Sequence, residues 1–213
     1  MQPYDCYLFD ADGTLFETTE LIYRCFVYSL NKYADRNIPR DEIIAGIGLT
    51  LRKQFERHIG PLSDEQFDRI QADHMDYQMR IYSDYLAPCP GVPEAIKKLH
   101  ASGKQLAIVT SRKITSLSCF LRETGIHEYF AVIVTPDETA HHKPHPEPAL
   151  KALELLKAAP ETALFVGDAP FDIECGSRAG IDTAFVAWSH NKADQMPIAP
   201  THVIHSMLDL CMP

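Results

Sequence analysis

The stretch Tyr7-Leu8-Phe9-Asp10-Ala11-Asp12-Gly13-Thr14-Leu15 decides the fold expected of this chain. Its apolar start predicts a short buried strand, and two carboxylates follow where that strand ends. Gly13 lets the backbone curl, so that Asp10 and Asp12 both face the crevice beyond the strand. Open α/β sheets bind ligands there, and carboxylate oxygens suit a hard cation such as Mg2+. The loop therefore predicts a nucleophile beside a metal site, although an acidic turn would use the same residues.

Composition and charge exclude several classes of protein. The 213-residue chain has an ordinary globular composition and a net charge of -9 at pH 7, which argues against a nucleic-acid partner. No apolar run approaches the ~18 residues of a membrane span, and the N-terminus lacks a signal-peptide pattern. The six cysteines form no CxxC pair and are expected to be reduced and buried. We therefore expect a cytoplasmic monomer or homodimer without a membrane partner.

Residues 16–86 show helical patterns and no convincing strand. Apolar residues recur at near-helical spacing from Thr18 to about Ala34, and further helices are predicted after Pro39 and from Thr50. Residues 63–66, Ser-Asp-Glu-Gln, predict a capping box for a fourth helix. We therefore predict a helical domain at 16–86, inserted into a core domain formed by 1–15 and 87–213.

From residue 88 onward, predicted helices and strands alternate regularly. Such alternation is typical of a parallel sheet covered by helices on both faces, so the fold class is α/β. A short edge strand is predicted in the tail at 202–204. The other predicted strands lie at 105–109, 131–134, 163–166 and 183–187, and the helices at 92–100, 114–124, 147–158 and 171–179.

Polar residues follow the predicted strands at the point where each ends. The carboxyl ends of strands in such a sheet converge on one crevice, so these side chains are expected to meet. Lys143 joins them from a stiff loop, His-His-Lys-Pro-His-Pro at 141–146, just before a helix. The residues at the strand ends are Asp10 and Asp12, Thr110 and Ser111, and Asp168, with Asp172 one helical turn further on.

Four motifs in this order resemble the haloacid dehalogenase superfamily of phosphohydrolases, over nearly the whole chain. They are Asp-x-Asp-Gly-Thr at 10–14, a strand ending in Thr-Ser at 110–111, a lysine before proline at 143, and Gly-Asp-x-x-x-Asp at 167–172. The chain is most similar to the phosphoglycolate phosphatase branch, in the subgroup with a helical cap inserted after the first motif. The resemblance implies a Rossmann-like parallel sheet core with an α-helical cap domain.

The resemblance also implies a reaction and a role for each residue. The expected enzyme is a Mg2+-dependent phosphomonoester hydrolase acting on a small, phosphoglycolate-like metabolite. Asp10 would become a transient aspartyl phosphate, while Asp12 would serve as general acid and then as general base. The expected ligands of Mg2+ are Asp10, Asp168 and the Asp12 carbonyl, and Asp172 would contact the ion directly, through a water molecule or through another ligand. Thr110, Ser111 and Lys143 would bind the phosphoryl group.

Substrate specificity is expected to come from the cap. Glu17 and Thr18 lie at the expected hinge, and residues 46–52 resemble the loop that closes over the substrate. Arg52 could bind a substrate carboxylate or a second phosphate, but it could equally be a helix-surface arginine. His141, His142 and His145 suggest a metal tract, yet we expect them to be solvated neighbours of Lys143 rather than zinc ligands.

Several alternatives stay open within the same resemblance. Dehalogenases need no second acid, so Asp12 argues against them, and phosphonate hydrolases need a cap lysine without a clear equivalent here. Sugar phosphomutases use a cap histidine at a hinge position that is Ile22 in this chain, which favours hydrolysis. An inorganic pyrophosphatase remains close in pattern. A non-catalytic phosphate-binding module is disfavoured, because such a protein has no physical need for the complete set of charged residues.

Overall fold

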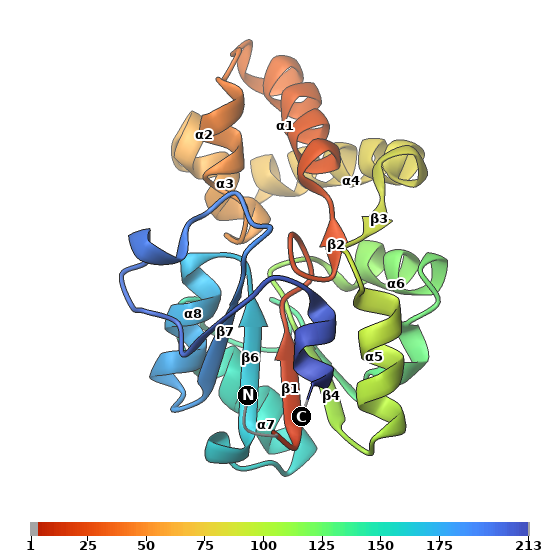
Figure 1. Ribbon diagram of the computed structural model, residues 1–213. Helices are drawn as coiled ribbons and strands as arrows, with labels where there is room; N and C mark the ends of the chain where they lie inside the picture. Colours follow the sequence, from red (N-terminus) through yellow and green to blue (C-terminus); the bar gives the residue numbers. More distant parts are fainter. Residues whose placement is uncertain (1–3, 213) are drawn as a thin grey trace.

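A six-stranded parallel sheet forms the centre of the protein, in a computed structural model that describes residues 4–212 (Figure 1). The strand order is β5-β4-β1-β6-β7-β8, so β1 pairs with β4 on one side and with β6 on the other. The α/β fold with a parallel sheet and a helical insertion is as predicted. The strands are β1 (Cys6–Phe9), β4 (Gln105–Val109), β5 (Val132–Val134), β6 (Ala163–Gly167), β7 (Asp182–Val186) and β8 (His202–Ile204).

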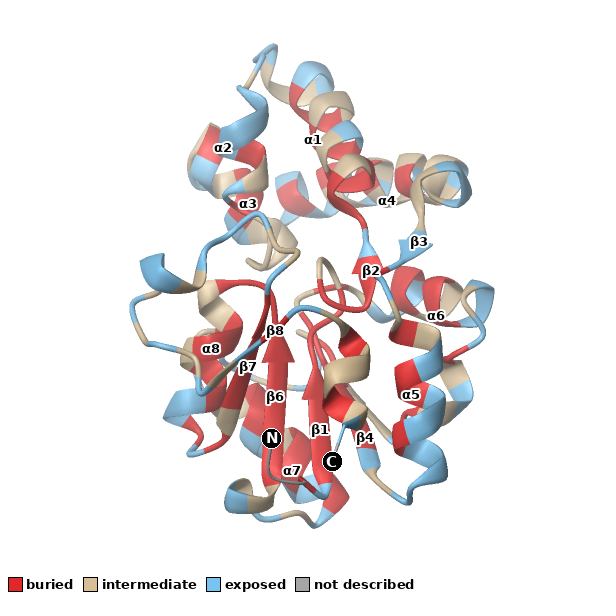
Figure 2. Cartoon of the chain, in the orientation of Figure 1, coloured by how far each residue is buried: buried red, intermediate tan, exposed pale blue. Residues whose placement is uncertain are grey.

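Alternate residues of β1 face opposite sides of the sheet, as the pleat of a strand requires. Tyr7 and Phe9 pack in one core cluster with α5 (Val92–Ala101) and α6 (Ile114–Glu123). Cys6 and Leu8 pack in a second cluster with α7 (Glu147–Leu156) and α8 (Pro170–Arg178). Figure 2 shows the strands as buried, with exposed residues on the outer sides of these helices. The sheet thus has two apolar layers that fix the register of β1.

The helical insertion lies beyond the carboxyl ends of the strands (Figure 1). Its own apolar core includes Phe26, Phe55 and Phe67. None of the helices within residues 4–212 is long and apolar enough to cross a membrane. The helices are α1 (Thr19–Ala34), α2 (Arg40–Ile44), α3 (Leu51–Ile59) and α4 (Asp64–Tyr85).

Local sequence patterns determine the start of α4 but not the edge of the insertion. The capping box predicted at its start is present: the Ser63 hydroxyl accepts from the Gln66 amide at 3.2 Å, and the Ser63 amide donates to the Gln66 side chain at 3.0 Å. The prediction of no strand within 16–86 is wrong at its edge. There β2 (Phe16–Glu17) pairs antiparallel with β3 (Ala87–Pro88). Two residues are too few to show strand periodicity, so only the tertiary pairing reveals this ribbon.

The tail and the loops add short helical turns. The edge strand predicted at 202–204 is present as β8. After it, η4 (Met207–Cys211) buries Met207 and Leu210 in the cluster that contains α5, although no helix is predicted there. The remaining turns are η1 (His127–Tyr129), η2 (Pro160–Thr162) and η3 (Ala193–Gln195).

Candidate active site

A cavity of about 370 Å³ lies between the carboxyl ends of the strands and the helical insertion. The sheet contributes Asp10, Asp12 and Thr110 to its walls, while the insertion contributes the segment 47–54 and the inner face of α4. The Asp10 amide donates to Val166 O at 2.9 Å, which extends the ladder of β1 past its last residue. The residues that follow β1 and β4 therefore open into one cavity shared with the insertion.

Lys143 is the central cation of this site. Its ammonium donates to Asp10 Oδ1 at 2.5 Å, to Asp172 Oδ1 at 2.7 Å and to Val109 O at 3.2 Å. All three charged side chains are at least 96% buried, since none is more than 4% exposed. Burial alone would lower the pKa of Lys143, but the two carboxylates raise it above its usual range. Lys143 is therefore a permanent positive charge beside the candidate nucleophile.

Three buried carboxylates, those of Asp10, Asp168 and Asp172, offer oxygens that lie within 4.8 Å of one another. Burial raises the pKa of Asp10 to about 7, although Lys143 opposes this shift. Burial and the two neighbouring carboxylates raise the pKa of Asp168 well above its ordinary value. When all three are ionised, these carboxylates exceed the single Lys143 ammonium by two negative charges, which a divalent cation would balance.

Asp168 Oδ1 supports a cation at this place directly. It is buried and has no hydrogen-bond partner within residues 4–212. An unpaired buried acceptor is costly unless an ion or water binds it. The site also leaves no room for other side chains, since a Cβ on Gly13 would lie 2.4 Å from Asp168 Oδ2 and one on Gly167 would lie 2.2 Å from the Asp172 Cβ. The residues present thus fit an oxygen-ligated ion such as Mg2+.

Asp12 is held by Arg112, a residue that the sequence analysis did not single out. Arg112 Nη2 donates to Asp12 Oδ1 at 2.6 Å and Nε donates to Asp12 Oδ2 at 2.9 Å, while the Thr18 hydroxyl donates to Oδ1 at 2.6 Å. Nη1 of Arg112 reaches Gln78 of α4 at 2.8 Å. Arg112 therefore joins the candidate acid-base residue to the insertion.

Thr110 and Ser111 lie at the end of β4 as predicted, and both line the cavity. The hydroxyl of Thr110 accepts from the Arg112 amide at 3.1 Å. The hydroxyl of Ser111 donates to Gly48 O at 2.7 Å, so Ser111 contacts the insertion. The sheet and the segment 47–54 are therefore in direct contact on this side of the cavity.

Glu17 and Arg52 make their hydrogen bonds away from the carboxylates around Lys143. Glu17 is exposed, accepts from the Thr19 amide at 2.9 Å and is not among the described residues that line the cavity. Arg52 does line it, but its guanidinium donates to Asp64 Oδ1 at 2.6 Å and stacks on Phe67. The charge of Arg52 is thus already paired within the insertion.

The loop after β7 supports the site from behind and was also missed. The Ser189 hydroxyl donates to Asp168 O at 2.7 Å, and Asn191 donates to the same carbonyl at 3.1 Å. The Trp188 indole donates to Gly13 O at 3.0 Å. These bonds join loops that are far apart in the sequence, so no local pattern indicates them.

Comparison with known proteins agrees with this geometry. The family model of haloacid dehalogenase-like hydrolases matches residues 7–186. The pyrophosphatase PpaX of Anoxybacillus flavithermus is 35% identical over 204 residues, which cover 95% of this chain and 93% of that protein. PpaX of Bacillus cereus strain G9842 is 34% identical with the same coverage.

Solved structures show the same architecture. A haloacid dehalogenase-like hydrolase candidate from Bacteroides fragilis has a TM-score of 0.88 and 27% identity, and the match covers 97% of this chain and 99% of that one. A candidate phosphoglycolate phosphatase from Lactobacillus plantarum has a TM-score of 0.85 and 27% identity, with 99% of both chains covered. The chain is therefore a phosphohydrolase of the haloacid dehalogenase-like hydrolase family.

Proposed function

We propose that this phosphohydrolase acts on inorganic pyrophosphate in the presence of Mg2+. The sequence motifs favoured a phosphoglycolate-like metabolite and left pyrophosphate as an alternative. The PpaX relatives, each similar over 95% of the chain, support the alternative better. One observation of the structure carries the proposal: Lys53 lines the cavity beyond Asp10 and has no ion pair within residues 4–212, whereas the other lining cations, Arg52, Arg112 and Lys113, are paired with Asp64, Asp12 and Asp137. Lys53 would bind the second phosphate of pyrophosphate, as cations do.

Asp10 would attack the phosphorus and form an aspartyl phosphate, releasing phosphate. Lys143 balances the charge that gathers on the phosphoryl oxygens, and Thr110 donates a hydrogen bond to one of them. Asp12 would then take a proton from the water that hydrolyses the intermediate. Asp10, Asp168 and the Asp12 carbonyl would hold Mg2+, and Asp172 would contact it directly or through another ligand. The bound ion would supply the positive charge that aligns the phosphoryl group.

We also propose that residues 16–86 act as a cap over this reaction. The support lies in the two contacts made across the cavity, from Ser111 to Gly48 O and from Arg112 to Gln78. Closure of such an element excludes bulk water and strengthens the electrostatic contacts inside. Ile22 of α1 lines the cavity at the hinge position where a phosphomutase would place a histidine, which favours net hydrolysis.

The test is phosphate release from pyrophosphate, 2-phosphoglycolate, a hexose phosphate and p-nitrophenyl phosphate, with and without Mg2+. We expect pyrophosphate to give the highest kcat/KM, and Asp10→Asn to remove Mg2+-dependent release from every substrate. Asp194→Asn, an exposed acid outside the cavity, is the matched control. A higher kcat/KM for 2-phosphoglycolate would return the assignment to the phosphoglycolate phosphatase branch. Turnover that survives Asp10→Asn would contradict the nucleophile.

A further inference from the structure

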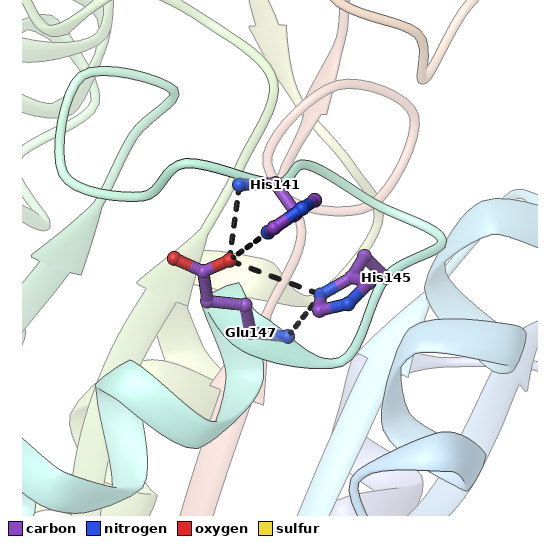
Figure 3. Close-up of side chains that lie close together, drawn as sticks. All are labelled: His141, His145 and Glu147. Atoms are coloured by element: carbon purple, nitrogen blue, oxygen red, sulfur yellow. Dashed lines mark hydrogen bonds and ion pairs between the residues drawn. The ribbon is translucent and has the colours of Figure 1, made fainter.

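Two histidines and one glutamate gather on the surface of the loop that contains Lys143 (Figure 3). His141 and His145 come from the loop, and Glu147 is the first residue of α7. Each offers one ligand atom, and these atoms all lie within 4.8 Å of one another. His141 Nδ1 is 2.6 Å and His145 Nδ1 is 3.9 Å from Glu147 Oε2. The three side chains thus converge on one small volume.

The backbone holds the Glu147 carboxylate in place before any ligand arrives. Its Oε1 accepts from the Ala140 amide at 2.9 Å, and its Oε2 accepts from the His141 amide at 3.0 Å. The hydrogen bond from His141 and these two amides lower the pKa of Glu147, so the carboxylate is charged at neutral pH. Such outer bonds orient a ligating carboxylate and reduce the entropy lost on binding.

The two imidazole rings are also arranged together. They stack with their centroids 4.3 Å apart and an angle of 25° between the planes. Their exposed fractions are 64% for the His141 side chain and 48% for that of His145, so an ion from solvent can reach both. His145 Nδ1 also accepts from the Glu147 amide at 3.2 Å, so an ion bound at this nitrogen would replace that hydrogen bond. His142, by contrast, lines the active-site cavity and does not take part.

We infer that His141, His145 and Glu147 form a second metal site, for an ion of the Zn2+ class. Two imidazoles and one carboxylate suit a borderline transition metal, with water in the fourth position. The Asp10, Asp168 and Asp172 cluster offers oxygens alone and suits Mg2+, so the two sites select different ions. The sequence favoured solvated histidines here, because spacing alone does not reveal that Glu147 faces two of them.

The proposed metal site lies on the same loop as the active-site residue Lys143. His141 and His145 flank Lys143 by two residues on either side. An ion bound to both histidines would link the two ends of this loop to each other and, through Glu147, to the start of α7. Occupancy of the site therefore stabilises the folded loop that presents Lys143 to Asp10.

The experiment is a Zn2+ titration of the full chain at saturating Mg2+. Calorimetry measures the affinity and stoichiometry, and NMR spectra of the histidine side-chain nitrogens show which histidines bind the ion. We expect one tight equivalent in the wild type, with two histidine side chains shifted. The double variant His141→Gln/His145→Gln should lose this equivalent, and Glu147→Gln should weaken it by about tenfold or more. His205→Gln, at an exposed histidine elsewhere, should bind as the wild type does.

Two outcomes would overturn the inference. One is the same Zn2+ affinity and stoichiometry in the wild type and in the double variant. The other is a wild type that binds no Zn2+ while Mg2+ occupies the active site. Far-UV circular dichroism of each variant shows whether it is folded. A titration of Asp168→Asn, which should keep the tight equivalent, separates this site from the acidic cluster.

Discussion

Arg112 is the residue whose role depends most on its surroundings. Its side chain is 5% exposed, and its partner Asp12 is 15% exposed. The guanidinium also lies over the ring of Phe120, 4.5 Å from its centroid, and donates to Ser116 Oγ at 3.1 Å. Removing one member of a buried ion pair leaves the other uncompensated, which costs about 3–5 kcal/mol. Arg112 therefore positions Asp12 as well as supplying charge to the cavity.

The first prediction concerns Arg112→Met. We expect kcat/KM for pyrophosphate to fall by about 100-fold or more, because a loss of about 3 kcal/mol corresponds to that factor. Arg112→Lys keeps the charge but loses the two-pronged contact with Asp12, so its activity should lie between those of Arg112→Met and the wild type. Arg122→Met, at an exposed position on α6, the helix that follows Arg112, is the control in steady-state assays. Wild-type kcat/KM in Arg112→Met would exclude the positioning role.

A position at the end of a strand is visible in the local sequence. Asp10, Thr110 and Asp168 each follow a short apolar run, and the parallel sheet then brings them together. Arg112 was missed because its partner Asp12 is distant in the sequence and a charged residue after a strand usually faces solvent. Arg52 was left open between a substrate ligand and a helix-surface arginine, and the structure pairs it with Asp64. Charge pairing depends on tertiary contacts, which no spacing rule contains.

The helices α1, α3 and α4 form a small core around one histidine. His74 of α4 is 2% exposed and lies edge-on to the rings of Phe26 and Phe55. Its Nδ1 is 3.0 Å from the Ser29 hydroxyl of α1. Burial, with a smaller contribution from Arg112, lowers the pKa of His74 from 6.5 to about 3. The packed insertion therefore contains a neutral imidazole.

The second prediction is a pH dependence of stability that His74 causes. Between pH 3 and 6.5 the unfolded chain binds a proton at His74 that the folded chain does not, so stability falls as the pH decreases. At pH 5 the expected loss is about 2 kcal/mol relative to pH 7.5. Urea unfolding of the wild type and of His74→Gln at both pH values measures it. The variant should lose about 2 kcal/mol less than the wild type, and an equal loss in both would contradict the assignment.

Gly48 links the insertion to the core at a second place. Its φ of 100° lies in the left-handed region, and a Cβ there would be 2.9 Å from Phe171 Cδ2 and 3.3 Å from the Ala169 Cβ. Residues other than glycine are strained at this φ, and a side chain at position 48 would also push against the start of α8. The Gly48 carbonyl accepts from Ser111, so a shift here alters the wall of the cavity.

The third prediction compares Gly48→Ala with Gly60→Ala. Gly60 has a similar φ of 84° in the same insertion, but a Cβ there would meet nothing within 4 Å. Both variants should lose about 1 kcal/mol from backbone strain. Only Gly48→Ala should also raise KM for pyrophosphate, by about tenfold if closure weakens by a further 1.4 kcal/mol. Equal KM values in the two variants would show that the contact with α8 is unimportant for substrate binding.

The sheet and the insertion depend on each other to form the site. The alternation of helices and strands was enough to predict the parallel sheet and the place of its crevice. The β2–β3 ribbon and η4 were not predicted, because each is too short to show a period and is stabilised by distant residues. The same limit applies to the loop after β7, whose bonds to Asp168 and Gly13 exist only in the folded chain.

The last prediction follows from the charge of the completed site. In the absence of a divalent cation, three buried carboxylates face only Lys143, and the excess charge opposes folding. Mg2+ binds the folded state alone, so at about 100 times its Kd it should add about 2.7 kcal/mol of stability. For a chain of this length, that corresponds to a rise in Tm of about 5–10 °C. Differential scanning calorimetry in EDTA and in Mg2+ measures the shift.

Asp168→Asn is the decisive variant for this Mg2+ effect. It removes one of the mutually repelling charges, so in EDTA it should melt at or above the wild-type temperature. It also removes a ligand, so Mg2+ should raise its Tm far less than that of the wild type. Asp194→Asn, outside the site, should show the full wild-type shift. A variant that melts lower in EDTA yet keeps the whole Mg2+ shift would mean that Asp168 is structural and that the cation binds elsewhere.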